Sequence, residues 1–146
     1  TIQAAWSYRP PRAKVRIFEG KELRLERDVS LLLAVAANSR YFGGGMCIAP
    51  QGELGDGLFF FMLAEQVGYL SLLRNLPDVY LKRRIRHPQI QYATGTRMEV
   101  MVQKGDLPIG IDGEFLKAPR AVFEILSGEL SLLVPRSTPS KSKIAE

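Results

Sequence analysis

The 146-residue sequence has little cysteine and histidine and no long apolar run. A helix that spans a bilayer needs about 20 consecutive apolar residues, whereas the longest runs here, 31–37 and 58–64, suit buried strands. Cys47 is the only cysteine, which excludes an internal disulfide and indicates a reducing compartment. The single histidine, His87, has no second histidine or cysteine ligand near it in the sequence, so a zinc site is not expected. A disulfide-stapled scaffold is excluded.

Two further signals are missing. Residues 1–12 are polar and carry prolines, without the apolar stretch of a secretory signal peptide, so we expect no export signal. The chain also contains no glycine loop of the Gly-x-x-x-x-Gly-Lys type, which cradles phosphates through its backbone amides. We therefore expect no nucleotide site within the chain.

The composition is that of one globular domain with a basic surface. Apolar residues make up 46% and charged residues 24%, as in ordinary globular proteins. The net charge of +5 favours anionic partners such as phosphate-bearing ligands, an anionic membrane or nucleic acid. Much of it comes from the run Lys82–His87, which we interpret first as a solvated helix end and second as a membrane contact. Nucleic acid is not expected, because no binding motif accompanies the charge.

The apolar pattern predicts a mainly β domain. We expect a lead-in over 1–12, the folded domain over 13–135 and a disordered tail over 136–146. A helical pattern between Gln66 and Arg86 is interrupted by Pro77, which predicts two short helices or a helix and a turn. Alternating or continuous apolar residues between turns predict strands over 13–18, 22–25, 30–37, 57–63, 90–93, 97–102, 109–111, 121–125 and 130–134. The strand 30–37 is apolar throughout, so we expect it to be covered on both faces. Many short strands with one helical insert indicate a β-sandwich or a barrel-like domain.

Two short motifs carry more specific information. The segment 38–50 reads NSRYFGGGMCIAP and is followed by Asp56-Gly57, and a second motif is Asp112-Gly113-Glu114. By itself, a glycine triplet indicates only a tight turn or bulge between strands. In this order, the motifs resemble the second domain of the diacylglycerol kinase and sphingosine kinase superfamily of lipid kinases. The resemblance runs from about Val15 to Pro135 and implies a β-sandwich, in agreement with the strand pattern.

The resemblance also implies an activity for the parent enzyme. Such kinases transfer the γ-phosphate of ATP to a lipid hydroxyl, with Mg²⁺ as cofactor. They bind ATP through a Gly-Gly-Asp-Gly-Thr loop in an N-terminal domain, and this chain contains no such loop. We therefore expect a substrate-side domain that is inactive alone, with a diacylglycerol- or sphingoid-type lipid as substrate.

Asp112-Gly113-Glu114 follows an apolar stretch and is, on its own, an ordinary hairpin signal. The resemblance implies that Glu114 is the general base that takes the proton from the lipid hydroxyl. It assigns Asp112 as an orienting or metal-linked neighbour. One well-aimed carboxylate suffices for such a step, because phosphoryl transfer depends mainly on positioning and charge neutralisation.

The loop 53–58 is the candidate metal site. The resemblance implies a structural or regulatory Mg²⁺ held by the Asp56 carboxylate and by main-chain oxygens of Glu53 and Leu58. Magnesium prefers such oxygen ligands and keeps several waters. The alternative is that Asp56 only stabilises an Asp-Gly turn before a strand.

Two other functions stay open. One is an NAD-kinase-like enzyme with a soluble acceptor, and the other is a non-catalytic module that binds an anionic lipid or a partner protein. For the leading hypothesis we expect a cytoplasmic location with peripheral contact to an anionic membrane. A homodimer is left open as the assembly.

Overall fold

The computed structural model describes residues 9–131 and 133. Within these ranges the chain forms a mainly β fold with one helix, α2 (Tyr69–Tyr80). The strands are β1 (Arg12–Glu19), β2 (Glu22–Ala37), β3 (Tyr41–Phe42), β4 (Met46–Cys47), β5 (Phe59–Glu65), β6 (Ile90–Gly95), β7 (Arg97–Val102), β8 (Leu107–Ile111), β9 (Glu114–Ala118) and β10 (Arg120–Glu124). The predicted mainly β architecture with one short helical insert is confirmed.

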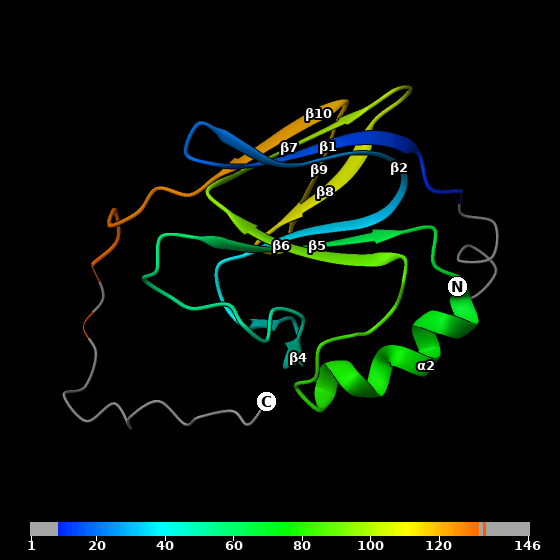
Figure 1. The fold of residues 1–146 in the computed structure, drawn as a ribbon, viewed down its shortest axis with the longest axis horizontal. Helices are drawn as coiled ribbons and strands as arrows, with labels where there is room; N and C mark the ends of the chain where they lie inside the picture. The colour runs from blue at the N-terminus through cyan, green and yellow to red at the C-terminus, as the bar shows by residue number, and fades with distance from the viewer. Residues whose placement is uncertain (1–8, 132, 134–146) are drawn as a thin grey trace.

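The long strand β2 joins the two layers of a sandwich. Its first half pairs with β1 and its second half with β5, and all pairs are antiparallel. The six-stranded sheet has the order β10-β7-β1-β2-β5-β6. It folds over along β2, so that β10, β7 and β1 lie above β5 and β6 (Figure 1). The edge strands β10 and β6 do not pair with each other, so the sheet is not closed into a barrel.

The main core lies between the two layers. Alternate residues of β1 (Ala13, Val15 and Ile17) are completely buried, while Lys14 and Arg16 between them face outward. They pack in one cluster with residues of β2, β5, β7 and β8, namely Leu31, Phe61, Leu63, Met98, Val100, Val102, Leu107 and Ile109. Burial of each large apolar side chain contributes about 1.5–3 kcal/mol. This alternation is the signal that predicted the strands.

A second cluster lies on the other side of β5. Met62, Ala64, Val67 and Ile90 form it, and Tyr92 packs against its edge. Burial raises the pKa of the Tyr92 phenol above its usual 10.0, although a hydrogen bond with the Ile85 backbone and the nearby Arg84 charge oppose this shift. Tyr92 is therefore neutral at physiological pH. Its ring lies beneath the Arg84 guanidinium, 4.5 Å from centroid to Cζ.

The predicted division of 22–37 into two strands is wrong. Glu26, Arg27 and Asp28 interrupt the apolar pattern, yet they pair in register with β1 and leave β2 continuous. The Glu26 carboxylate bonds across the strands to Arg16 at 2.6 Å, which keeps these charged side chains on the outer face. The predicted cover on both faces of 30–37 is also incomplete, because Leu33 is 44% exposed.

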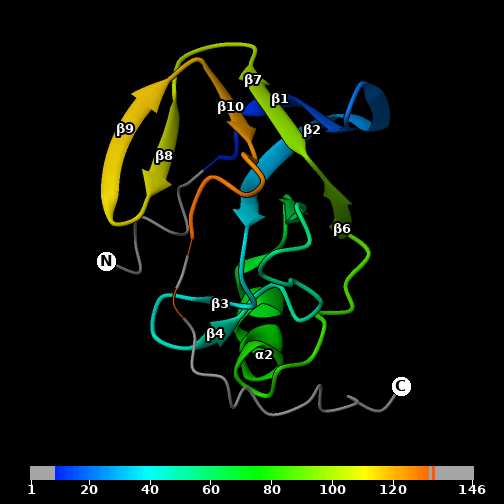
Figure 2. The same cartoon turned by 90° about the vertical axis from the view of Figure 1, so that its left-hand side faces the viewer.

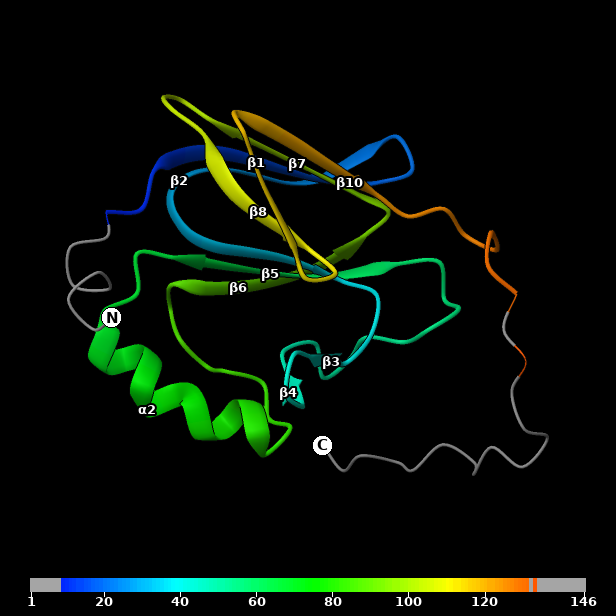
Figure 3. The ribbon, with the colours of Figure 1, turned by 180° about the vertical axis from the view of Figure 1, so that it is seen from behind.

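Helix α2 is one helix, not a pair of helices. Pro77 lies inside it, in the last turn, where the Leu81 amide still donates to the Pro77 carbonyl at 2.9 Å. No helix in the described part of the chain reaches the length and apolar character needed to span a bilayer. Figure 3 shows α2 on the far side of β5 and β6 from the main core, with its C-terminal end beside β4.

Near the C-terminus, the predicted strand 130–134 is not found. Leu130, Ser131 and Leu133 are not in a strand, and the other two positions lie outside the described residues, as does the predicted tail. Three strands were not predicted, β3, β4 and β9. The first two have only two residues each. Strand β9 has no buried residue, so it lacks the alternating signal of a half-buried strand.

Candidate functional site

The motif Asp112-Gly113-Glu114 forms the tip of the β8–β9 hairpin. Asp112 and Gly113 have φ values of +48° and +94°. A tight two-residue hairpin turn requires positive φ at both of its central residues, and aspartate and glycine adopt positive φ more readily than most residues. Ile111 pairs with Glu114, so Glu114 is the first residue of β9, and both acidic residues are exposed. The turn holds Asp112 and Glu114 at one end of the hairpin, with water-accessible carboxylates.

The glycine triplet forms the turn of a second small hairpin. It connects β3 to β4, with φ values of +52° at Gly43 and +88° at Gly45. The turn expected from the triplet alone is confirmed. It leaves Tyr41 and Phe42 of β3 49% and 56% exposed, while Cys47 of β4 is buried, as expected for a small apolar side chain.

Both hairpins border one apolar cavity of about 410 Å³. Figure 2 shows them on the same side of the molecule, with the tip of β8–β9 directed toward β3–β4. The wall consists of the second half of β2 together with residues of β3, β7, β8, β9 and β10, namely Leu31, Leu32, Leu33, Ala34, Val35, Ala36, Phe42, Val100, Leu107, Pro108, Ile109, Gly110, Phe115, Ala121 and Phe123. It contains no charged side chain. The cavity is therefore suited to an apolar ligand.

The rim of this cavity is unusually apolar for an exposed surface. Leu33, Phe42 and Phe115 are 44%, 56% and 87% exposed. Phe115 follows Glu114 directly, and its ring lies over Gly110. A Cβ atom added at Gly110 would be 3.4 Å from the Phe115 ring. Asp112 and Glu114 themselves do not line the cavity, and the side chains of Glu114 and Phe115, successive residues of β9, point to opposite faces of the hairpin. The sequence analysis predicted a role for Glu114 but did not single out Phe42 or Phe115 as wall residues.

The loop 53–58 has the turn that its sequence predicts. The Leu58 amide donates to Asp56 Oδ1 at 2.9 Å, so Asp56 stabilises the turn. The Glu53 carboxylate lies 3.8 Å from Arg40 Nη2. Within residues 9–131 and 133 there is no cluster of three or more metal-ligating side chains. Asp56 is the one side chain of the predicted Mg²⁺ ligands, so an ion held in this loop would depend on backbone carbonyls and on water for its other ligands. This loop does not line the cavity.

Removal of the Asp56 carboxylate tests the metal prediction. In an active kinase that contains this domain, Asp56→Ala is expected to abolish any saturable Mg²⁺ dependence beyond that of the ATP-bound metal, because the other ligands are neutral carbonyls. Activity is measured during a Mg²⁺ titration at constant MgATP. Asp56→Asn, which keeps an acceptor for the Leu58 amide, serves as the control for the turn. An unchanged titration for Asp56→Ala would leave Asp56 a turn residue only.

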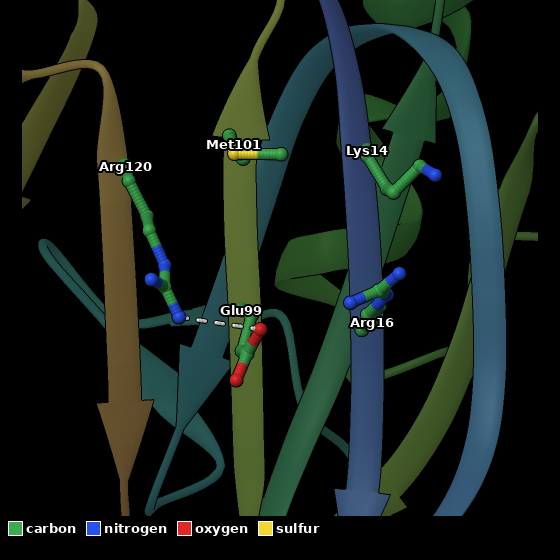
Figure 4. Close-up of a pocket in the computed structure, with 5 residues that line it drawn as sticks. All are labelled: Lys14, Arg16, Glu99, Met101 and Arg120. Atoms are coloured by element: carbon green, nitrogen blue, oxygen red, sulfur yellow. Dashed lines mark ion pairs between the residues drawn. The ribbon is translucent and has the colours of Figure 1, made fainter.

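A second, smaller cavity of about 160 Å³ lies on the outer face of β1, β7 and β10. Figure 4 shows its lining, which consists of Lys14, Arg16, Glu99, Met101 and Arg120. Arg120 pairs with Glu99 at 3.5 Å, and Arg97 also bonds to Glu99. Because the charges neutralise one another, we interpret this surface as an ion-pair network, not as the functional site.

Sequence comparison places the chain among known proteins. It matches the family of the YegS C-terminal NAD kinase beta sandwich-like domain over residues 1–134. It is 27% identical over 134 residues to a probable lipid kinase YegS-like of Chromohalobacter salexigens, covering 92% of this chain and 41% of the relative. It is 29% identical over 121 residues to a diacylglycerol kinase of Mycobacterium tuberculosis, covering 82% and 37%. The chain thus spans about two fifths of the length of these relatives.

Solved structures share the fold. A putative diacylglycerol kinase from Bacillus anthracis superimposes with a TM-score of 0.58 at 17% identity, over 87% of this chain and 43% of that one. A second structure, described as a diacylglycerol kinase from the same organism, gives a TM-score of 0.55 over 80% and 40%. At this identity the likeness concerns the fold alone.

Proposed function

Because this chain belongs to the family of YegS-type C-terminal domains found in lipid kinases, we propose that it is the substrate-side domain of an ATP-dependent lipid kinase. The acceptor is the hydroxyl of a diacylglycerol- or sphingoid-type lipid, and ATP is held by a separate domain of the kinase. The observation that carries the proposal is the apolar cavity of about 410 Å³ beside the hairpin with Glu114.

The cavity accounts for the lipid and the hairpin for the chemistry. Acyl chains bury apolar surface against β2 and β8, which contributes about 25 cal/mol per Å² of apolar area removed from water. The lipid hydroxyl then remains at the exposed rim, on the side of the hairpin whose turn carries Asp112 and Glu114. An apolar wall and two exposed carboxylates on one hairpin support this assignment.

In the proposed reaction, Glu114 accepts the proton of the lipid hydroxyl as its oxygen attacks the γ-phosphorus of ATP. The new oxygen–phosphorus bond forms while the bond to the β-phosphate oxygen breaks, and ADP leaves. Asp112 lies in the turn that precedes Glu114, and from there it orients either the lipid hydroxyl or the Glu114 carboxylate. Bound Mg²⁺ neutralises negative charge in such a transfer.

The lipid assignment is tested at the exposed rim. We expect Phe42→Ser with Phe115→Ser to weaken binding of a fluorescent diacylglycerol analogue by about tenfold or more, because each loses apolar contact worth roughly 1.5–3 kcal/mol when fully buried. Binding is measured by fluorescence anisotropy in detergent micelles. The matched control is Leu23→Ser with Leu126→Ser, which are 47% and 72% exposed and do not line the cavity.

The same assay separates the competing functions. A sphingosine analogue distinguishes the two lipid classes, and NAD serves as the soluble acceptor of the NAD-kinase-like alternative. Equal binding of the diacylglycerol analogue by the rim variant and by its control would remove the cavity from lipid binding. Binding of NAD but of neither lipid would favour the soluble acceptor.

A further inference from the structure

The C-terminal end of α2 and strand β3 together form a basic and aromatic surface, which we call the α2–β3 patch. Its residues are Tyr41, Tyr80, Leu81, Lys82, Arg83 and Arg86. The chain leaves α2 at Leu81, and the extended segment that follows runs back to β6. Figures 1 and 3 both show this end of α2 close to the β3–β4 hairpin. Residues from two separate parts of the sequence therefore share one surface.

The positive charges of this patch are not neutralised by carboxylates. Lys82, Arg83 and Arg86 of the patch and the neighbouring Arg84 are all exposed, and in the described ranges no carboxylate oxygen lies within 4.0 Å of their side-chain nitrogens. The basic residues of the outer sheet differ in this respect. Lys14 and Arg16 both pair with Glu26, and Arg120 pairs with Glu99. A run of basic residues without an ion-pair partner in the described ranges thus lies at α2–β3.

Aromatic rings hold two of these cations in place. Lys82 Nζ lies 5.5 Å from the centroid of the Tyr41 ring, and Arg84 Cζ lies 4.5 Å from that of Tyr92. Such contacts are worth about 0.5–1 kcal/mol at exposed sites. Lys82 also has a φ of +59°, a left-handed conformation that non-glycine residues seldom adopt. The backbone reverses there and positions Lys82 over β3.

Apolar groups are exposed among the cations. Tyr41, Tyr80 and Leu81 are 49%, 55% and 58% exposed. Tyrosine is enriched where protein meets the membrane interface, and leucine inserts into the boundary of the acyl chains. Clustered basic residues beside exposed apolar groups complement an anionic lipid surface in both charge and hydrophobicity.

We propose that the α2–β3 patch docks the protein on an anionic membrane surface. The inference rests on the proposed function, because it explains how a water-exposed cavity receives a lipid. Tyr41 and Phe42 are adjacent in β3, and successive side chains of a strand point to opposite faces. Tyr41 contacts Lys82 of the patch, while Phe42 lines the cavity. Docking of the patch therefore holds the cavity wall close to the bilayer, on the opposite face of β3 from Tyr41.

The test uses the full chain and vesicles that contain no diacylglycerol, so it is independent of substrate binding. Co-sedimentation is measured with phosphatidylcholine vesicles, with and without phosphatidylglycerol. We expect binding only with the anionic lipid. The triple variant Lys82→Gln, Arg83→Gln, Arg86→Gln should bind on the order of a hundredfold more weakly, because each basic residue near an anionic surface contributes roughly fivefold. Arg84 is kept, because it covers Tyr92 in the fold.

The matched control removes the same charge from the outer sheet through Lys14→Gln, Arg16→Gln and Arg120→Gln. This control should bind nearly as well as the unaltered chain. Should it not fold, as judged by thermal unfolding, Lys21→Gln, Arg24→Gln and Arg27→Gln in the β1–β2 region replace it. Leu81→Ser, at an exposed position, should also reduce binding severalfold.

Three results would overturn the proposal: no binding to anionic vesicles, an equal loss in the patch and control variants, or unchanged binding in the patch variant. An equal loss would assign the attraction to net charge alone. Failure of vesicle binding with intact binding of the diacylglycerol analogue in micelles would reject the patch and keep the proposed function. Failure of analogue binding with intact vesicle docking would reject the lipid cavity and keep the patch.

Discussion

Glu114→Gln is expected to reduce the turnover of a kinase containing this domain by about 10²–10⁴-fold, the usual loss when a general base is removed. Glutamine has the shape of glutamate but cannot accept the proton of the lipid hydroxyl. Glu114 is exposed and makes no ion pair in the described part of the chain, so its replacement leaves no partner unsatisfied. The thermal stability and the affinity for the lipid analogue should therefore stay nearly constant while kcat falls.

The neighbouring aspartate provides the control for this prediction. Asp112→Asn keeps a residue that tolerates the φ of +48° in the turn, so the hairpin should persist. If Asp112 acts only by orienting the reacting groups, Asp112→Asn should lower kcat less than Glu114→Gln does. Both are measured as single-turnover rates with saturating MgATP and a short-chain diacylglycerol. Unchanged turnover for Glu114→Gln would remove it from the role of base, and a larger loss for Asp112→Asn would transfer that role to Asp112.

The chain alone is expected to show no ATP-dependent lipid phosphorylation. Its sequence has neither a Gly-x-x-x-x-Gly-Lys loop nor a Gly-Gly-Asp-Gly-Thr loop, so backbone amides that cradle the phosphates are missing. Phosphoryl transfer depends on holding those phosphates in line with the acceptor. Addition of an N-terminal ATP-binding domain from the family, on the same polypeptide, should restore activity.

This expectation is measured with radiolabelled ATP and a short-chain diacylglycerol in mixed micelles, for the chain alone and for the joined protein. The joined protein with Glu114→Gln is the matched negative control. Measurable phosphorylation by the chain alone, free of contaminating kinase, would show that it holds nucleotide without a glycine loop. Activity of the joined protein that survives Glu114→Gln would instead come from the added domain or from another base.

Local sequence was sufficient for most of the strands and for the turns at the motifs. In β1, Val15 and Ile17 alternate with Lys14 and Arg16. The burial of the strand follows the same alternation, with the two apolar side chains buried and the two basic ones partly exposed. Asp112-Gly113 and the glycine triplet form the turns that their φ preferences predict. These features depend on near neighbours in the chain, so a sequence pattern reports them directly.

Sequence reasoning failed where distant residues decide the structure. Residues 26–28 read as a break in the strand pattern, but pairing with β1 and the bond from Arg16 to Glu26 keep β2 continuous. Pro77 reads as a helix breaker, yet it lies in the last turn of α2 without ending it. Strand β9 exists because it pairs with β8, not because of an apolar pattern.

The same distinction applies to the candidate site. By itself the sequence determined a mainly β domain with the two motifs of a lipid-kinase second domain, and it singled out Asp112, Glu114 and Asp56. Only the tertiary structure decided that Phe42 and Phe115, from separate hairpins, share the wall of one cavity with β2. It also decided that Tyr41 lies beneath Lys82 at the end of α2. Each of these contacts joins residues far apart in the chain, and their positions are set by strand pairing and packing, which no local pattern encodes.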